Sequence, residues 1–295
     1  MRVKILALGL LLAAGAASAQ DRVDEQRPLA ADGTVVIEIG NGAVRVVGWD
    51  KATVSVTGTL NSDAERLSVR GDKSKMRVEV VPLRHDHPAG ADLEVHVPAG
   101  SRVQVESFQA AVAVEGISGS VRAETVNSGI SLSGGADDAQ LESVNGAVTI
   151  RGRCARLRAE STNGPVTIAD PGGEVQAGTV NGPLIVTGAR ALSRGRLESV
   201  NGRVSFEGQL VGRGTLDVET VGGAVDLTIA GPADFKITTF NGTVVNELGP
   251  PARRSHEESE DDDSPGKELT FAVGSGGGHV TVNTLNGRVR LLASH

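Results

Sequence analysis

One eleven-residue stretch of this chain occurs more than once. E-S-V-N-G-A-V-T-I-R-G, at residues 142–152, returns as E-S-V-N-G-R-V-S-F-E-G at residues 198–208, with looser copies before, between and after. Aligned on the asparagine of the N-G pair, the copies between residues 109 and 241 follow at steps of 18, 18, 18, 18, 20, 21 and 19 residues. A short, fixed period indicates stacked structural repeats. The aligned positions are Asn41, Gln109, Asn127, Asn145, Asn163, Asn181, Asn201, Gly222, Asn241 and Asn286.

Each repeat alternates inward and outward positions on both sides of its N-G pair. In the repeat of Asn145 the inward positions are Leu141, Ser143, Val148 and Ile150. A period of two on each side of a turn indicates strand, turn, strand. Because glycine and asparagine tolerate a positive φ, we expect left-handed turns at these pairs. The expected turn residues are Asn41, Asn127, Asn145, Gly146, Asn163, Gly164, Asn181, Gly182, Asn201, Gly202, Asn241, Gly242, Asn286 and Gly287.

The repeats predict an all-β protein. Stacking places identical columns about 4.8 Å apart, and hairpins would not require the same column order in every repeat. We therefore expect a single-stranded parallel β-helix, or solenoid, with about 18–21 residues per coil and an N-terminal β cap. The 39 glycines and only six aromatic residues agree with tight turns and a core of small branched side chains. Phe108, Phe206 and Phe235 fall in columns that we assign to this core.

The chain divides into three expected regions. Residues 1–19 follow the charged, apolar, small-residue order of a secretory signal peptide, which predicts export to the periplasm, the cell surface or the medium. Residues 20–100 are expected to form N-terminal strands and the cap, with a first coil near 34–48, and residues 101–295 the solenoid. Residues 250–266 are acidic and bounded by prolines, which predicts a mobile loop. No apolar run is long enough for a membrane-spanning helix.

Charged residues form two outward columns. Without residues 1–19 the chain has 27 basic and 36 acidic residues, a formal charge of −9, which disfavours nucleic acid as a partner. A basic column two residues from an acidic one offsets the repulsion between stacked glutamates. These columns are either a solvated surface or a charged binding strip, and their members are Arg122, Glu124, Glu142, Arg158, Glu160, Arg196, Glu198 and Glu219.

Few residues suggest chemistry. His85 and His87 have a spacing compatible with a metal but no third ligand in view, so we expect an exposed turn and no metal or other cofactor. The acidic run 257–263 lacks the ligand pattern of a calcium loop. Cys154 is the only cysteine. Nearby arginines could lower its pKa, yet a quiet, partly buried thiol is the simpler interpretation.

Two further features carry a family resemblance. L-E-V-H-V-P-A-G-S-R-V-Q-V at residues 93–105 and G-G-G-H-V-T-V-N-T-L-N-G-R-V-R-L at residues 276–291 flank the succession of V-N-G turns. With these motifs the chain resembles the bacterial putative-adhesin family of exported β-strand-repeat proteins, a domain of unknown function. The resemblance implies a β-helical, non-enzymatic envelope protein with an adhesive or interaction role, and it defines no catalytic residues.

Three functions are therefore weighed. The first is an adhesin-like binding or scaffolding module that contacts a protein or glycan of the cell envelope. The second is a periplasmic partner in envelope-stress signalling, which the resemblance also implies. The third is a polysaccharide-active enzyme, which the scattered aromatic residues and the lack of a supported carboxylate pair disfavour. The oligomeric state is not determined by the sequence.

Overall fold

The structure is a computed structural model that describes residues 22–84, 88–249, 253–254 and 266–293. The signal peptide predicted at 1–19, the candidate metal ligands His85 and His87 and most of the acidic loop at 250–266 lie outside the described residues. Every described secondary-structure element is a β-strand, so no described segment is a helix that could span a membrane. The expectation of an all-β protein is confirmed.

The predicted fold class, a single-stranded parallel β-helix, is wrong. All 25 strands of the described residues join one mixed sheet that curls almost completely around a single core. Five strand pairs among the described residues are antiparallel, all of them near the two ends. In the central repeats a strand lies on each side of the turn, and β17 and β18 each continue from one repeat into the next. The period of the sequence shows which residues stack, but it does not determine strand direction where the period is lost.

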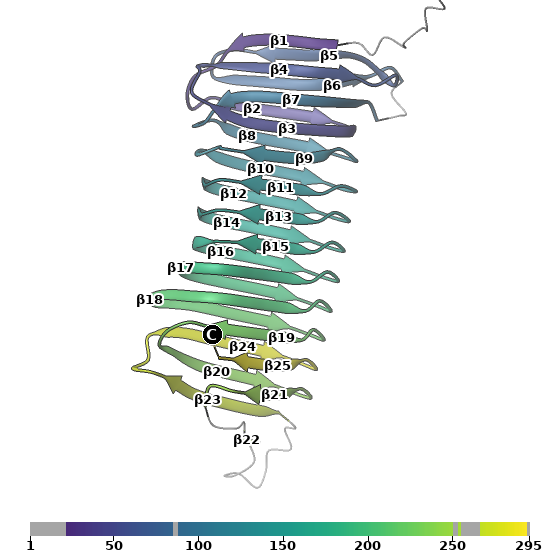
Figure 1. The fold of residues 1–295 in the computed structure, drawn as a ribbon. Helices are drawn as coiled ribbons and strands as arrows, with labels where there is room; N and C mark the ends of the chain where they lie inside the picture. Colours follow the sequence, from purple (N-terminus) through teal and green to yellow (C-terminus); the bar gives the residue numbers. More distant parts are fainter. Residues whose placement is uncertain (1–21, 85–87, 250–252, 255–265, 294–295) are drawn as a thin grey trace, which may run out of the picture.

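The central repeats form the regular part of the elongated molecule (Figure 1). Their strands pair in parallel with the strands of the next repeat, and the Cα partners keep the 18-residue spacing, as in Leu141 with Ala159. The column alignment expected from the sequence is therefore confirmed here. The strands are β8 (Arg102–Ser107), β9 (Ala111–Glu115), β10 (Ser120–Thr125), β11 (Ile130–Ser133), β12 (Ala136–Ser143), β13 (Val148–Arg151), β14 (Cys154–Ser161), β15 (Val166–Ala169), β16 (Gly172–Thr179), β17 (Leu184–Ser199), β18 (Val204–Thr220) and β19 (Val225–Ile229).

The N-terminal end interrupts the repeat order. The first two inner strands pair in parallel with β8 and β9, far along the chain, and residues 50–98 add strands beyond them. Two of these added strands run antiparallel to their neighbours. The strands are β1 (Arg22–Pro28), β2 (Thr34–Ile39), β3 (Asn41–Trp49), β4 (Thr53–Leu60), β5 (Ala64–Gly71), β6 (Lys75–Pro82) and β7 (Gly90–Pro98).

The C-terminal repeats stack out of sequence order. The last repeat of the chain lies between two earlier ones, because β24 pairs with both β18 and β20. Asn241 Nδ2 accordingly donates to Asn286 Oδ1 at 3.2 Å. The strands are β20 (Ala233–Thr239), β21 (Thr243–Asn246), β22 (Arg253–Arg254), β23 (Lys267–Val273), β24 (Gly278–Thr284) and β25 (Arg288–Leu292).

Small aliphatic side chains fill the core, with a few larger ones toward the C-terminal end. The inward columns expected from the alternation are buried, including Leu141 and Ile150. Phe206 and Phe235 are also buried, as predicted, at 1% and 2% exposure. Cys154 is 3% exposed, and burial raises the pKa of its thiol, so the quiet cysteine expected from the sequence is what the fold contains.

The N-G turns are built differently from the expectation. Gly146, Gly164, Gly182 and Gly202 do not have a positive φ. Instead, a Cβ on any of them would lie within 2.0 Å of a carbonyl oxygen in the neighbouring repeat. Glycine is therefore required because the turn backbones pack against one another, and the left-handed explanation of these turns is wrong.

The turn asparagines bond to each other along the stack. Asn163 Nδ2 donates to Asn145 Oδ1 at 2.7 Å, and Asn181 Nδ2 donates to Asn163 Oδ1 at 2.8 Å. Equivalent bonds join Asn145 to Asn127 and Asn201 to Asn181. The asparagines thus form a ladder that holds consecutive turns in register.

Candidate functional site

A long groove follows the outer surface of the stack beside the asparagine ladder. Its volume is about 1230 Å³, and its floor is a row of nine serine and threonine residues, one from each of nine stacked repeats. Neighbouring strands are about 4.8 Å apart, so the groove is about 38 Å long. In stacking order the floor residues are Ser107, Thr125, Ser143, Ser161, Thr179, Ser199, Thr220, Thr284 and Thr239.

The floor hydroxyls belong to the turns. Ser161 Oγ accepts a hydrogen bond from the Gly164 backbone N–H at 3.0 Å and donates to the Gly146 carbonyl at 2.9 Å. Ser143 and Thr179 make the same pair of contacts in their own repeats. Thr125 differs, because its buried Oγ1 has no hydrogen-bond partner among the described residues. Most of the floor is therefore structural, and the walls offer the contacts for a ligand.

One wall of the groove is apolar. It is formed by the residues directly before the turn asparagines, and its exposed members are 38–46% accessible. Large apolar side chains aligned on one surface are rare in soluble proteins unless they contact a partner. The lining residues of this apolar wall are Val126, Val144, Val180, Val200, Val221, Leu285 and Phe240, with Thr162 as its one polar member.

The apolar wall was missed in the sequence, although a signal for it is present. Valine precedes the N-G pair in copy after copy, and a position next to an inward Ser or Thr must point outward. Phe108 belongs to the same outward column and is 45% exposed, so its assignment to the core is wrong.

The other wall is the predicted acidic column, extended by Glu106, which was not among the predicted residues. Glu106, Glu124, Glu142, Glu160, Glu198 and Glu219 line the groove, with Gly178 in the place of a seventh glutamate. The predicted basic column lies beside it, away from the groove, and all eight residues of the predicted charged columns lie in these two rows.

Ion pairs connect the two columns at alternate repeats. Arg122 Nε donates to Glu124 Oε1 at 2.6 Å, and Arg158 lies 2.8 Å from Glu160. Arg196 pairs closely with Glu198 and lies 3.8 Å from Glu219. Hydrogen bonding to the neighbouring glutamate raises the pKa of Arg122 and of Arg196.

The intervening repeats have glutamine in the basic column, at Gln104, Gln140 and Gln176. Consequently neither Glu106 nor Glu142 forms an ion pair or a side-chain hydrogen bond with a described residue, although the charge of Arg122, which lies in the repeat between them, acts on both. The acidic wall thus presents two unpaired carboxylates to the groove.

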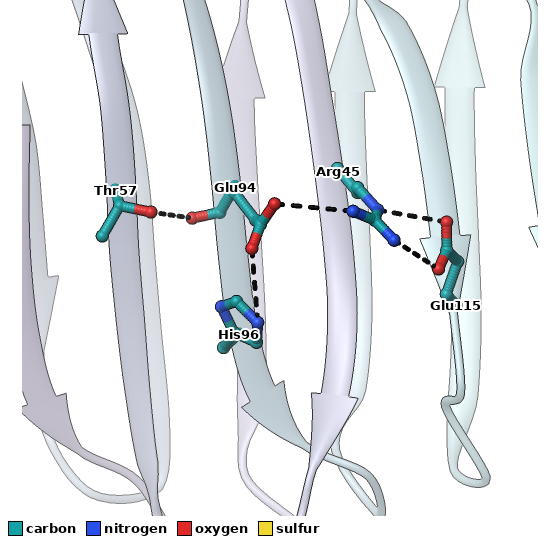
Figure 2. A network of polar contacts seen from close by, with 5 residues as sticks. All are labelled: Arg45, Thr57, Glu94, His96 and Glu115. Carbon is teal, nitrogen blue, oxygen red and sulfur yellow. Dashed lines mark hydrogen bonds and ion pairs between the residues drawn. The ribbon is translucent and has the colours of Figure 1, made fainter.

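A second hollow of about 640 Å³ lies near the N-terminal end, and its lining includes Arg45 and Glu94, two members of a charged network. Figure 2 shows Arg45 on β3 between Glu115 on β9 and Glu94 on β7. Arg45 donates to Glu115 at 3.1 and 2.8 Å and lies 3.6 Å from Glu94, whose other oxygen is 3.4 Å from His96 Nε2. Hydrogen bonding to Arg45 lowers the pKa of Glu115. Because these charges satisfy each other, the network joins strands and presents no open site.

Among the described residues, no group of three or more His, Cys, Asp or Glu side chains is placed to hold a metal ion. The fold and the groove together define an all-β repeat protein with a long, acidic and apolar surface groove.

No family model and no curated protein matches the chain. Solved structures do match. A putative adhesin from Parabacteroides merdae aligns over 93% of this chain and 97% of its own, with 9% identity and a TM-score of 0.45. A putative adhesin from Bacteroides fragilis covers 93% and 98%, with 9% identity and a TM-score of 0.46. A putative lipid binding protein from Parabacteroides distasonis covers 92% and 97%, with 11% identity and a TM-score of 0.46.

Two of these structures are described as putative adhesins, the family whose motifs the sequence resembles. At identities of 9–11% they carry no conclusion about the ligand or the activity of this chain.

Proposed function

We propose that this protein is a non-catalytic, adhesin-like binding module whose long groove holds a segment of its partner. The observation that carries the proposal is the apolar wall, which runs unburied along the stack opposite a row of carboxylates. Such a surface loses free energy when a partner covers it, at about 25 cal/mol for each Å² of apolar area removed from water.

The width of the groove limits the form of the partner. Its two walls come from residues two apart in sequence, as with Glu142 in β12 and Val144 just after the end of that strand, so their Cα atoms are at most about 7 Å apart. An α-helix with its side chains is about 10–12 Å across and cannot enter. The groove therefore suits an extended polymer chain, which agrees with a protein or glycan strand as the partner.

The location of the partner follows from the N-terminal sequence. The signal-like order of residues 1–19 supports export, and with it a partner in the cell envelope. A stress-signalling partner would use the same groove, but nothing in the groove favours that role over adhesion.

The test is whether binding depends on the apolar wall. In the variant Val180→Thr/Val200→Thr each side chain keeps its shape and strand preference but becomes polar. We expect the fluorescently labelled variant to bind isolated envelopes of the producing bacterium about tenfold more weakly than the parent protein, because two apolar contacts are lost.

The matched control is Val211→Thr/Val245→Thr, which makes the same change at two equally exposed valines outside the groove. It should bind like the parent protein. Equal binding by the groove variant and the parent would reject the groove as the binding site.

A further inference from the structure

We propose that the groove takes a cationic polyproline II segment with a basic residue at every third position. This inference rests on the proposed function and names the class of partner. It depends on the spacing of the unpaired carboxylates, on the arginines between them and on the apolar wall.

The unpaired carboxylates have a defined spacing. Glu106 and Glu142 are two repeats apart in the same column, with Glu124 between them. Two strand separations amount to about 9.6 Å. Residues i and i+3 of a polyproline II helix lie on one side of that helix and about 9.3 Å apart. A basic residue at every third position would therefore meet both free carboxylates in one binding register.

The ion-paired Glu124 between these two carboxylates disfavours a ligand with basic residues spaced one repeat apart. Arg122 donates to Glu124 and already neutralises it. A ligand cation opposite Glu124 would meet a carboxylate that is already paired, whereas cations opposite Glu106 and Glu142 meet carboxylates without a direct side-chain partner, although the charge of Arg122 acts on both. The next position of the same two-repeat series is Gly178, where even an added Cβ would have no neighbour nearer than 3.9 Å. This gap leaves room for a further ligand side chain.

The apolar wall suits the remaining residues of such a segment. Val126 and Val144 face the stretch between Glu106 and Glu142 across the groove. Proline rings on the other sides of the ligand would cover them. A polyproline II helix is slender, has no internal hydrogen bonds and is largely preformed, so it loses little conformational entropy on binding.

The experiment measures the binding of synthetic peptides to the full chain. The probe is (Pro-Pro-Lys)₄, and the comparison peptides are (Pro-Pro-Glu)₄ and (Pro-Pro-Pro-Lys)₄. The last has the same number of lysines but places them about 12.4 Å apart, out of step with the carboxylates. We expect (Pro-Pro-Lys)₄ to bind several-fold more tightly than the out-of-step peptide, (Pro-Pro-Glu)₄ not to bind, and the affinity to fall as salt is added.

Variants locate the peptide. Glu106→Gln and Glu142→Gln should each weaken (Pro-Pro-Lys)₄ binding by about two- to fivefold, the range expected for exposed ion pairs, and the double variant by about the product. Glu207→Gln, which removes an exposed carboxylate outside the groove, should have no effect.

Three results would overturn the inference. These are equal affinity for the two lysine peptides, no effect of the Glu106→Gln/Glu142→Gln variant, or displacement of the peptide by a neutral oligosaccharide or a fatty acid. Each leaves the proposed function standing if the Val180→Thr/Val200→Thr variant still loses envelope binding. If that variant instead binds envelopes as tightly as the parent protein, the groove itself is rejected as the binding site. Failure of the peptide inference can therefore be distinguished from failure of the proposed function.

Discussion

At the residue scale, the repeated motif combines two roles in adjacent positions. In the repeat of Asn145, Ser143 and Gly146 build the turn, while Glu142 and Val144 form the walls of the groove. The same five residues therefore satisfy the needs of folding and present a surface. Repetition turns each of these roles into a row along the molecule.

The glycine of the turn offers a sharp test of its close packing. An added Cβ at Gly164 would lie 2.0 Å from the Gly146 carbonyl oxygen. We expect Gly164→Ala to lower the free energy of unfolding by about 1–3 kcal/mol, the usual cost of overpacking. The measurement is chemical denaturation followed by circular dichroism.

Gly178→Ala is the control for this substitution. The nearest atom to a Cβ at Gly178 is 3.9 Å away, and its φ is not in the left-handed region. We expect a change between zero and a gain of about 1 kcal/mol, because alanine restricts the unfolded chain. Equal losses for the two variants would show that glycine is needed for flexibility and not for space.

At the scale of elements, the Arg45 network joins the added N-terminal strands to the first repeats. Arg45 on β3 contacts Glu115 on one side and Glu94 on the other (Figure 2). The contact is between strands that are far apart in sequence. The contribution of this contact to the free energy of unfolding therefore measures how strongly the N-terminal strands are coupled to the first repeats.

The pKa of Glu115 makes this contribution depend on pH. Because pairing with Arg45 lowers the folded-state pKa of Glu115 from its ordinary value of 4.5, the stabilisation is complete above that value. It is lost as the pH falls through the lowered folded-state pKa. We expect Glu115→Gln to be less stable than the parent protein at about pH 7 and equally stable in strong acid.

Urea midpoints measured across this pH range would test the expectation. The control is Glu207→Gln, which changes an exposed glutamate away from the network. A difference between Glu115→Gln and the parent that stays constant down to strong acid would show that the carboxylate's charge is not the cause.

At the scale of the whole molecule, a single core runs from the N-terminal strands to the last repeat. Repeat proteins are stabilised mainly by contacts between neighbours. The continuous core nevertheless predicts that a destabilising substitution in the central repeats also lowers the stability of the N-terminal end. The fluorescence of Trp49, the one tryptophan of the chain, reports the unfolding of β3 near the N-terminal end.

Leu141→Ala tests this coupling. Leu141 is fully buried on β12, and the substitution should cost about 2–5 kcal/mol. We expect Trp49 fluorescence and circular dichroism to report the same lowered midpoint. A shift seen by circular dichroism alone would show that the N-terminal end unfolds independently.

The sequence by itself determined the all-β composition, the spacing of the repeats, the buried columns and the two charged columns. These properties are local, because alternation and period act between residues that are neighbours along the chain or one repeat apart. The glutamates from Glu124 to Glu219 could therefore be placed in one row before the fold was known.

Only the tertiary structure decided the rest. It inserted the repeat of Asn286 between those of Gly222 and Asn241, and it turned strands at both ends antiparallel. It also made a groove of the outward valines and left Glu106 and Glu142 unpaired. These outcomes depend on contacts between distant segments, which compete for the same open edge of the sheet. The period of a single repeat does not determine which of these segments pairs with that edge.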